Sequence, residues 1–123
     1  RYVDDFVIVN HSRKNLLDKR GEISRFLYTH LNIELHPEKT KIIPFSQGID
    51  FVGFRNFRHF KLLRKRNIRK MKNKIFQFNK GDLTFSEIFD SFKGWSAYAK
   101  WANAENLRKE LCFEIIEILL DKV

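Results

Sequence analysis

Three apolar stripes at helical spacing run through the second half of the chain and constrain its fold more than any other feature. Their members are Ile68, Met71, Ile75 and Phe78; Phe85, Ile88, Phe89, Phe92, Trp95 and Ala99; and Leu107, Leu111, Ile115, Ile118 and Leu119. Apolar residues three or four positions apart share one face of an α-helix. Thr84 followed by Glu87 is typical of a capping box, and Gly81 suits a helix end. The pattern predicts three packed helices, the last over roughly residues 105–120.

The first half of the chain has a different pattern, in which one helix lies among short extended pieces. A stripe that includes Leu16, Ile23 and Leu27 follows the capping side chains of residues 10–12 and predicts a helix to about residue 31. Strands are predicted on either side of an Asp-Asp turn within residues 2–9, and then at residues 33–35, 41–45 and 49–54. Hairpins are predicted across residues 47–48 and 58–60. The predicted fold class is therefore α+β, with a change of composition near residue 64.

Positive charge is concentrated in the middle of the chain. The formal net charge is +9, and residues 54–80 hold 11 basic side chains and no acidic one. A solvated lysine-rich helix is the simpler explanation. A segment with so many basic and no acidic side chains nevertheless favours contact with the phosphates of a polyanion. The composition does not identify that polyanion.

Asp4 and Asp5 are adjacent carboxylates at the tip of an apolar predicted hairpin. They repel each other, and the flanking strands offer little solvation. A hard divalent cation offsets both costs, and Mg²⁺ (or Mn²⁺) binds through one or two carboxylates while keeping positions for water and phosphates. Two such ions would support phosphoryl transfer. An exposed turn without an ion is the alternative, but the aromatic and apolar flanks favour the metal site.

Four stretches of the sequence resemble reverse transcriptases, in the order in which that family carries them. They are Tyr2-Val3-Asp4-Asp5, similar to the Tyr-X-Asp-Asp motif; Leu35-His36-Pro37-Glu38-Lys39-Thr40, similar to the following palm motif; Gly48-Ile49-Asp50-Phe51-Val52-Gly53-Phe54, similar to the primer grip with valine for the usual leucine; and residues 62–67 with 91–107, similar to the thumb. The run over residues 1–9 is especially similar to the bacterial group II intron, retron and diversity-generating retroelement enzymes. The thumb residues are most similar to the diversity-generating retroelement branch.

This resemblance implies a fold, an activity and partners. Residues 1–63 would be the C-terminal part of a polymerase palm, with β-hairpins and one helix, and residues 64–123 a three-helix thumb. The activity would be RNA-directed DNA polymerisation, a two-metal nucleotidyl transfer onto a primer 3′ hydroxyl. The partners would be an RNA template, a DNA primer, a dNTP and an accessory protein of a retroelement.

The resemblance also assigns roles near the reacting atoms. Asp4 would be the metal ligand and Asp5 its less direct partner, both catalytic, with Tyr2 near the incoming nucleotide or the primer end. Lys39 would lie beside the triphosphate and neutralise or protonate the leaving pyrophosphate. On spacing alone, Lys39 is equally well a solvated lysine.

Two further groups of residues would contact nucleic acid. Val52, Gly53 and Phe54 would bind the primer, with the glycine allowing close approach of the backbone, although a simple bulge is the alternative. Phosphate contacts would come from Arg64, Lys65, Arg66, Arg69, Lys70, Lys72 and Lys74, giving salt-dependent affinity with little sequence selectivity. The aromatic side chains of Trp95, Tyr98 and Trp101 could stack on bases, but their spacing favours packing.

The sequence lacks parts that a two-metal polymerase needs. A further palm aspartate and the fingers are missing, so we expect a fragment that synthesises no DNA by itself, taken from a parent that does. Its open palm edges are expected to favour self-association. The alternatives are an RNA or RNA–DNA binding module with an inert Asp-Asp turn, such as a maturase or accessory protein, and a related lineage that works in phage defence or untemplated synthesis.

The numbers and spacing of the cysteine and histidine residues argue against a disulfide-bonded protein and against a metal site built from histidines. Cys112 is the single cysteine and has no partner for an intramolecular disulfide, and the four histidines have no metal-binding spacing. No stretch approaches the roughly 18 apolar residues of a membrane span, and the first residues do not resemble a signal peptide. The expected location is the reducing cytoplasm, away from membranes, and the resemblance implies that of a bacterium.

Overall fold

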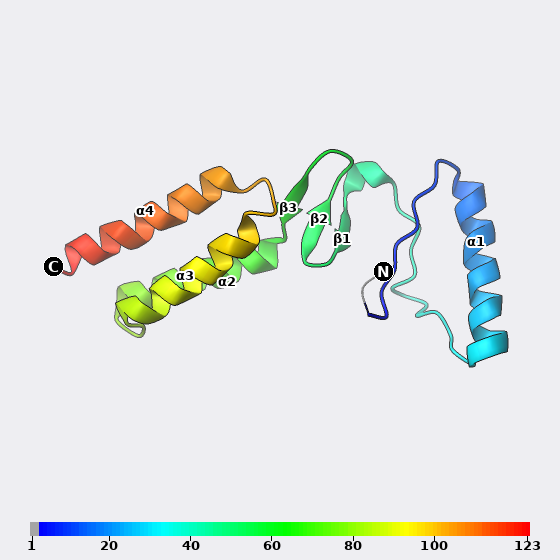
Figure 1. The fold of residues 1–123 in the computed structure, drawn as a ribbon, viewed down its shortest axis with the longest axis horizontal. Coiled ribbons are helices and arrows are strands. Elements are labelled where there is room, and N and C mark those ends of the chain that lie inside the picture. The colour runs from blue at the N-terminus through cyan, green and yellow to red at the C-terminus, as the bar shows by residue number, and fades with distance from the viewer. Residues whose placement is uncertain (1–2) are drawn as a thin grey trace. The chain divides into compact units, whose positions relative to one another are not determined.

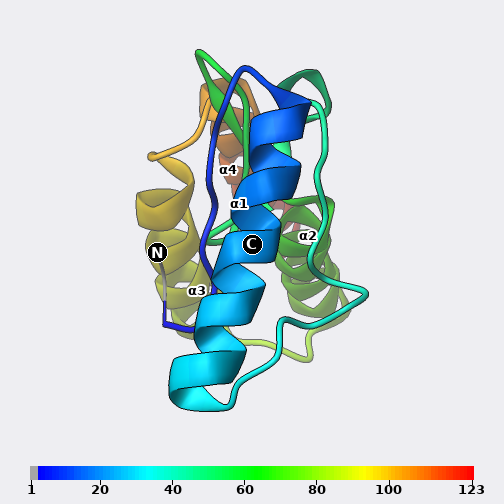
Figure 2. The ribbon, with the colours of Figure 1, turned by 90° about the vertical axis from the view of Figure 1, so that its right-hand side faces the viewer.

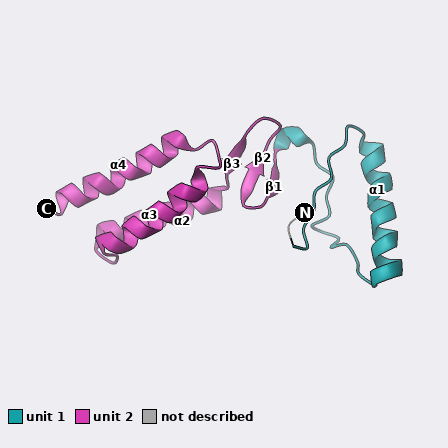
Figure 3. Cartoon of the chain, in the orientation of Figure 1, with its two compact units in different colours: residues 1–47 teal, residues 48–123 magenta. Residues whose placement is uncertain are grey.

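The computed structural model describes residues 3–123, which form two compact units (Figure 3). Unit 1 is Arg1–Gln47 and unit 2 is Gly48–Val123. The described residues contain four α-helices and one three-stranded antiparallel sheet, which confirms the α+β class. The boundary between the units precedes the sheet, so all three strands belong with the last three helices. The composition change near residue 64 lies inside unit 2.

Unit 1 consists of the helix α1 and two flanking segments with little regular structure. The helix α1 spans Arg13–Phe26, continues as a π-helical turn over Leu27–Leu31 and ends at Asn32, whose backbone is left-handed. Ser12 caps its start, because the side chain of Ser12 accepts a hydrogen bond of 3.3 Å from the Asn15 N–H. The predicted helix is thereby confirmed. The segments before and after α1 lie on either side of it in Figure 2.

The strands predicted within unit 1 are wrong. Val3 and Asp4 form a turn and Asp5 makes an isolated β-bridge, but residues 6–10, 33–35 and 41–44 have no regular structure. The reason is that β-propensity mainly reflects how well a side chain packs on a half-buried sheet, and a strand also needs a neighbouring backbone. None of the described residues of unit 1 is buried.

Unit 2 begins with the sheet, in the order β1-β2-β3. The strand β1 spans Ile49–Phe51, β2 spans Phe54–Asn56 and β3 spans Lys61–Leu63, with Phe51 opposite Phe54 and Phe54 opposite Leu63. The predicted hairpin across residues 58–60 is confirmed. The predicted hairpin across residues 47–48 is wrong, because Phe45–Gln47 is a 3₁₀ turn and β1 pairs forward with β2 instead.

Three helices complete unit 2, as the stripes predicted (Figure 1). The helix α2 spans Lys65–Lys80, α3 spans Phe85–Ala99 and α4 spans Glu105–Asp121, and each contacts the other two. Their core is made by the buried members of the three stripes, Met71, Ile75, Phe78, Ile88, Leu111 and Ile115. A second cluster joins the sheet to the bundle through Phe54, Leu63, Ala99 and Ala104. No helix within residues 3–123 combines the length and apolar character that crossing a membrane requires.

The C-terminal end of α2 and the start of α3 follow the predicted capping chemistry. Gly81 has a φ of +90°, and the N–H groups of Gly81 and Asp82 donate to the carbonyls of Phe78 and Gln77, the pairing of a Schellman motif. Thr84 and Glu87 form a complete capping box. The Thr84 N–H and hydroxyl each donate to Glu87 Oε2 at 2.8 Å.

The capping box predicts a pH dependence of stability. The bonds from the Thr84 backbone and hydroxyl lower the pKa of Glu87 below its ordinary value of 4.5. A lowered pKa in the folded state means that this contribution is present above pH 4.5 and is lost as the pH falls through the folded pKa. Urea unfolding of the wild type and of Glu87→Gln, measured across this range, should therefore show a shallower acid loss in the variant. Identical pH profiles would contradict this account.

Candidate functional site

The Asp-Asp turn is exposed and its backbone is strained. Asp4 and Asp5 are both solvent-exposed, and Tyr2 lies outside the described residues. Val3, immediately before the two aspartates, has a φ of +50°, in the left-handed region that a β-branched residue rarely adopts. Strained backbone of this kind clusters at functional sites, where the surrounding structure sustains it.

Two carboxylates fit a magnesium ion only if other groups complete its shell. Within residues 3–123 no three His, Cys, Asp or Glu side chains lie close enough together to hold a metal ion. Mg²⁺ nevertheless requires only one or two protein carboxylates, since water and substrate phosphates supply the rest. The donor set at Asp4 and Asp5 is therefore compatible with Mg²⁺ bound together with a phosphate ligand.

Lys39 lies in a turn that its neighbour His36 closes. The Thr40 N–H donates to the His36 carbonyl at 3.0 Å, and the Lys39 N–H lies 3.4 Å from His36 Nδ1. The Lys39 side chain is exposed, and no ion pair within residues 3–123 involves its ammonium group. Its charge is thus available to an anion, but no described contact joins Lys39 to Asp4 or Asp5.

The predicted primer-grip residues form a tight turn between β1 and β2. Val52 and Gly53 have φ values of +54° and +81°, and positive φ at both central residues is the mark of a type I′ turn. The Tyr98 hydroxyl, on α3, donates to the Gly53 carbonyl at 2.9 Å. Gly53 is therefore needed for this turn and for close contact with Tyr98, and it does not form a bulge within a strand.

Phe54 and Val52 differ in what they can contact. Phe54 is buried, with its ring stacked on that of Tyr98 at 4.7 Å between centroids, whereas Val52 is exposed. Burial raises the pKa of the Tyr98 hydroxyl above 10.0, although nearby Arg64 opposes the shift. The hydroxyl therefore remains a donor at neutral pH. Of the two predicted primer-binding residues that carry a side chain here, Val52 is open to a ligand and Phe54 is not.

The turn and Tyr98 predict a coupled loss of stability. Gly53→Ala should cost about 1–3 kcal/mol, because the residue must keep a positive φ and its new Cβ would overlap the Tyr98 hydroxyl oxygen. Tyr98→Phe should cost about 1 kcal/mol for the lost hydrogen bond. The double variant should cost less than the sum, because phenylalanine lacks the overlapping oxygen. Strict additivity in chemical denaturation would contradict this coupling.

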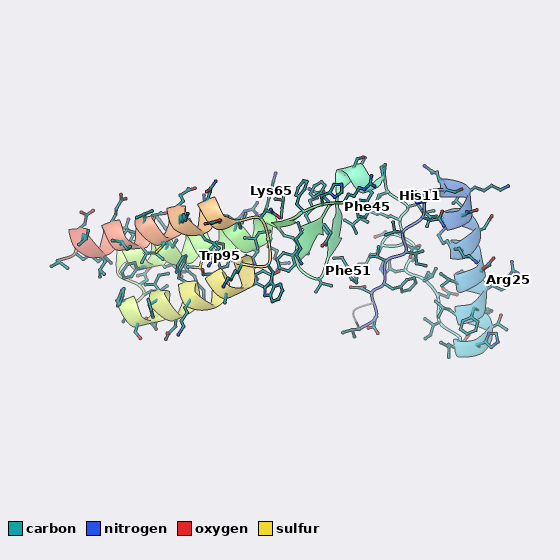
Figure 4. The ribbon with its side chains drawn as sticks, turned by 45° about the horizontal axis from the view of Figure 1, so that its top comes forward. His11, Arg25, Phe45, Phe51, Lys65 and Trp95 are labelled. Carbon is teal, nitrogen blue, oxygen red and sulfur yellow. The ribbon has the colours of Figure 1, made fainter. Side chains whose placement is uncertain are left out.

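The predicted phosphate-binding cations lie together on α2 and at its N-cap. Arg64, Lys65, Arg66, Arg69, Lys70, Lys72 and Lys74 are all exposed. All but Arg64 and Lys74 lie on the sides of α2 away from Met71, Ile75 and Phe78. Figure 4 shows Lys65 extending outward from the first turn. Lys74 donates to the Ser91 hydroxyl at 3.0 Å, and Arg64 lies 3.9 Å from Asp50. The other five form no ion pair with any described residue.

Two residues of the sheet, Asp50 and Asn56, form polar contacts that the sequence-based predictions did not include. Asp50 lies 3.7 Å from Arg55 as well as 3.9 Å from Arg64, and these half-exposed pairs orient the arginines more than they stabilise the fold. The Asn56 amide donates to the carbonyls of Ile49, Phe51 and Phe54 and so joins β1 to β2. Asp50 lies inside the stretch that is similar to the primer grip, so the sequence offered a reason to single it out. Nothing in the sequence marks Asn56.

The three aromatic residues at a spacing of three have different surroundings. Trp95, labelled in Figure 4, donates from its indole N–H to Asn67 Oδ1 on α2 at 2.6 Å, and Tyr98 packs on Phe54. The predicted packing role is confirmed for these two. Trp101, which follows α3, is 73% exposed and does not pack in the core.

Comparisons with protein-family models and with curated proteins found no match for this chain. The likeness to reverse transcriptases therefore stays a prediction that depends on the motifs and on the geometry of the residues that carry them.

Proposed function

We propose that this chain is the palm and thumb part of a bacterial RNA-directed DNA polymerase, and that the exposed face of α2 holds the template–primer duplex. One observation carries the proposal. The six predicted cations of α2 are exposed and have no carboxylate partner among the described residues, and the segment of residues 54–80 that holds them has no acidic residue. A cationic face of this kind gains affinity by releasing the counterions that are condensed on a duplex.

The remaining groups have complementary roles in this proposal. Asp4 and Asp5 would hold Mg²⁺, which when bound supplies Lewis-acid stabilisation of the phosphoryl oxygens. The exposed Lys39 ammonium would stabilise the charge that develops on the leaving pyrophosphate. Val52, at the exposed tip of the β1–β2 turn, would contact the primer strand.

The salt dependence of binding tests the α2 face. The triple variant Arg66→Gln, Arg69→Gln, Lys70→Gln should weaken binding to an RNA–DNA duplex and lower the slope of log K against log salt by roughly 3, about one for each lost phosphate contact. The measurement is fluorescence anisotropy of a labelled duplex over a range of salt concentrations.

A matched control removes the same charge elsewhere on unit 2. Lys93→Gln, Lys100→Gln, Lys109→Gln neutralises three exposed cations that lie outside residues 54–80. This control should leave the slope almost unchanged, since those lysines contact no phosphate in the proposal. Equal slope changes in the two triple variants would reject a localised interface on α2.

A second function is favoured by the division into units. All seven α2 cations lie in unit 2, which has its own hydrophobic core, whereas Asp4, Asp5 and Lys39 lie in unit 1. Unit 2 would therefore suffice for an RNA or RNA–DNA binding module without synthesis. The polymerase function requires the carboxylates of Asp4 and Asp5, whereas the binding module does not. Substitution of the two aspartates therefore distinguishes the two functions.

A further inference from the structure

The helix α4 carries a second apolar stripe that the packing of unit 2 does not use. Leu111 and Ile115 are buried against α2 and α3, which lie together on one side of α4 in Figure 1. Phe113, Ile116 and Leu120 are 64%, 43% and 67% exposed. At 3.6 residues per turn these three fall on the opposite side of the helix. The helices α2 and α3, on which α4 packs, contact its other side.

The spacing of the exposed stripe matches a helix that packs on another helix. Phe113, Ile116 and Leu120 occupy positions i, i+3 and i+7, the positions that anchor an amphipathic helix to its partner. Large apolar side chains gathered on one exposed face of a protein mark an interaction surface more often than isolated ones do.

One edge of this stripe is acidic. Glu110, Glu114, Glu117 and Asp121 follow one another at intervals of four, three and four residues, so they form a line beside the stripe. None of the four forms an ion pair within residues 3–123. The neighbouring Lys122 does not neutralise them, because its ammonium contacts the Phe78 carbonyl and ring.

The acidic edge also lies where a helix disfavours negative charge. The last turn of α4 contains Asp121 and no basic residue. A carboxylate at a helix C-terminus is repelled by the partial negative charge of the unsatisfied carbonyls there. A cation supplied from outside would offset this cost, and a nucleic acid would increase it.

From these observations we propose that the outward face of α4 binds a basic amphipathic helix of another protein. The stripe would accept the apolar face of that helix, and the acidic edge would pair with its lysine or arginine side chains. A second copy of this chain fits poorly. In an antiparallel pair the acidic edge would face itself, and in a parallel pair it would meet the opposite edge of the stripe, where Glu105, Cys112 and Leu119 offer no cation. The proposal is independent of the polymerase function.

The test uses two synthetic helical peptides of about five turns that differ only in charge. Both carry leucine at the a and d positions of a heptad, with lysine at e and g in one and glutamate in the other. Fluorescence anisotropy with the full chain should show the basic peptide binding at least about tenfold more tightly than the acidic one. Phe113→Ala, Leu120→Ala should weaken that binding by about tenfold or more.

Charge reversal gives the sharper comparison. Glu114→Lys, Glu117→Lys should remove or reverse the preference for the basic peptide. The control Asp82→Lys, Asp90→Lys reverses two exposed carboxylates away from α4 and should leave it intact. All four positions are on the surface, so circular dichroism should be unchanged.

Three results would overturn the proposal. The first is equal affinity for both peptides, which would indicate unspecific apolar adhesion. The second is no saturable binding of the basic peptide below about 100 µM. The third is a concentration-dependent dimer in sedimentation experiments that Leu120→Ala abolishes, which would assign the face to a second copy of the chain.

Discussion

Asp4→Ala or Asp5→Ala, placed in a longer polypeptide that contains this chain and extends primers, should lower the rate of nucleotide addition by about a thousandfold or more. The reason is that the carboxylates would hold the ion that stabilises charge on the phosphoryl oxygens, a stabilisation of several kcal/mol. Duplex binding should change by less than about twofold, because in the proposed function the α2 cations would supply the affinity gained by counterion release. Single-turnover extension and anisotropy measure the two quantities separately.

Asp18→Ala is the matched control for the aspartate substitutions. Asp18 is an exposed carboxylate on α1, in the same unit as Asp4 and Asp5, and the proposal gives it no role. Its removal should leave both extension and binding unchanged. If the Asp4 and Asp5 variants extend primers as fast as the Asp18 variant, the polymerase function is rejected and the binding module remains.

The largest effect on stability is expected in the helical core of unit 2. Ile75 is 0% exposed and lies in the cluster with Met71, Ile88 and Leu111. Ile75→Ala removes buried methyl groups and leaves a cavity that close-packed helices fill only in part, so unfolding should become easier by about 2–5 kcal/mol. Chemical denaturation followed by circular dichroism measures this change.

The adjacent residue provides the control for the core substitution. Phe76 is 54% exposed, and its ring contacts the Lys80 ammonium group at 4.6 Å. Phe76→Ala should therefore cost no more than about 1 kcal/mol. A similar loss in both variants would mean that the packing of the three helices differs from the one described.

The cationic face of α2 and the primer-grip turn at Gly53 differ in how far the sequence predicted them. For the cations of α2, the helical period of the apolar residues already fixes which positions point outward, and the structure confirms that all seven are exposed. For the primer-grip residues, the sequence indicated a glycine near a strand but not the Tyr98 hydroxyl that binds its carbonyl. The two residues are 45 positions apart, and only the packing of α3 on the sheet brings them together.

The sequence by itself determined the four helices, the caps at Ser12, Gly81 and Thr84, and the face that each bundle helix buries. These features depend on interactions within a few positions along the chain, such as the Thr84–Glu87 box and the i, i+4 stripe through Met71 and Ile75. The tertiary structure alone decided which extended segments became strands. A strand needs a backbone partner at a distance, so β1 paired with β2 through two residues of positive φ, while the equally β-prone residues 6–9 and 41–45 formed no ladder.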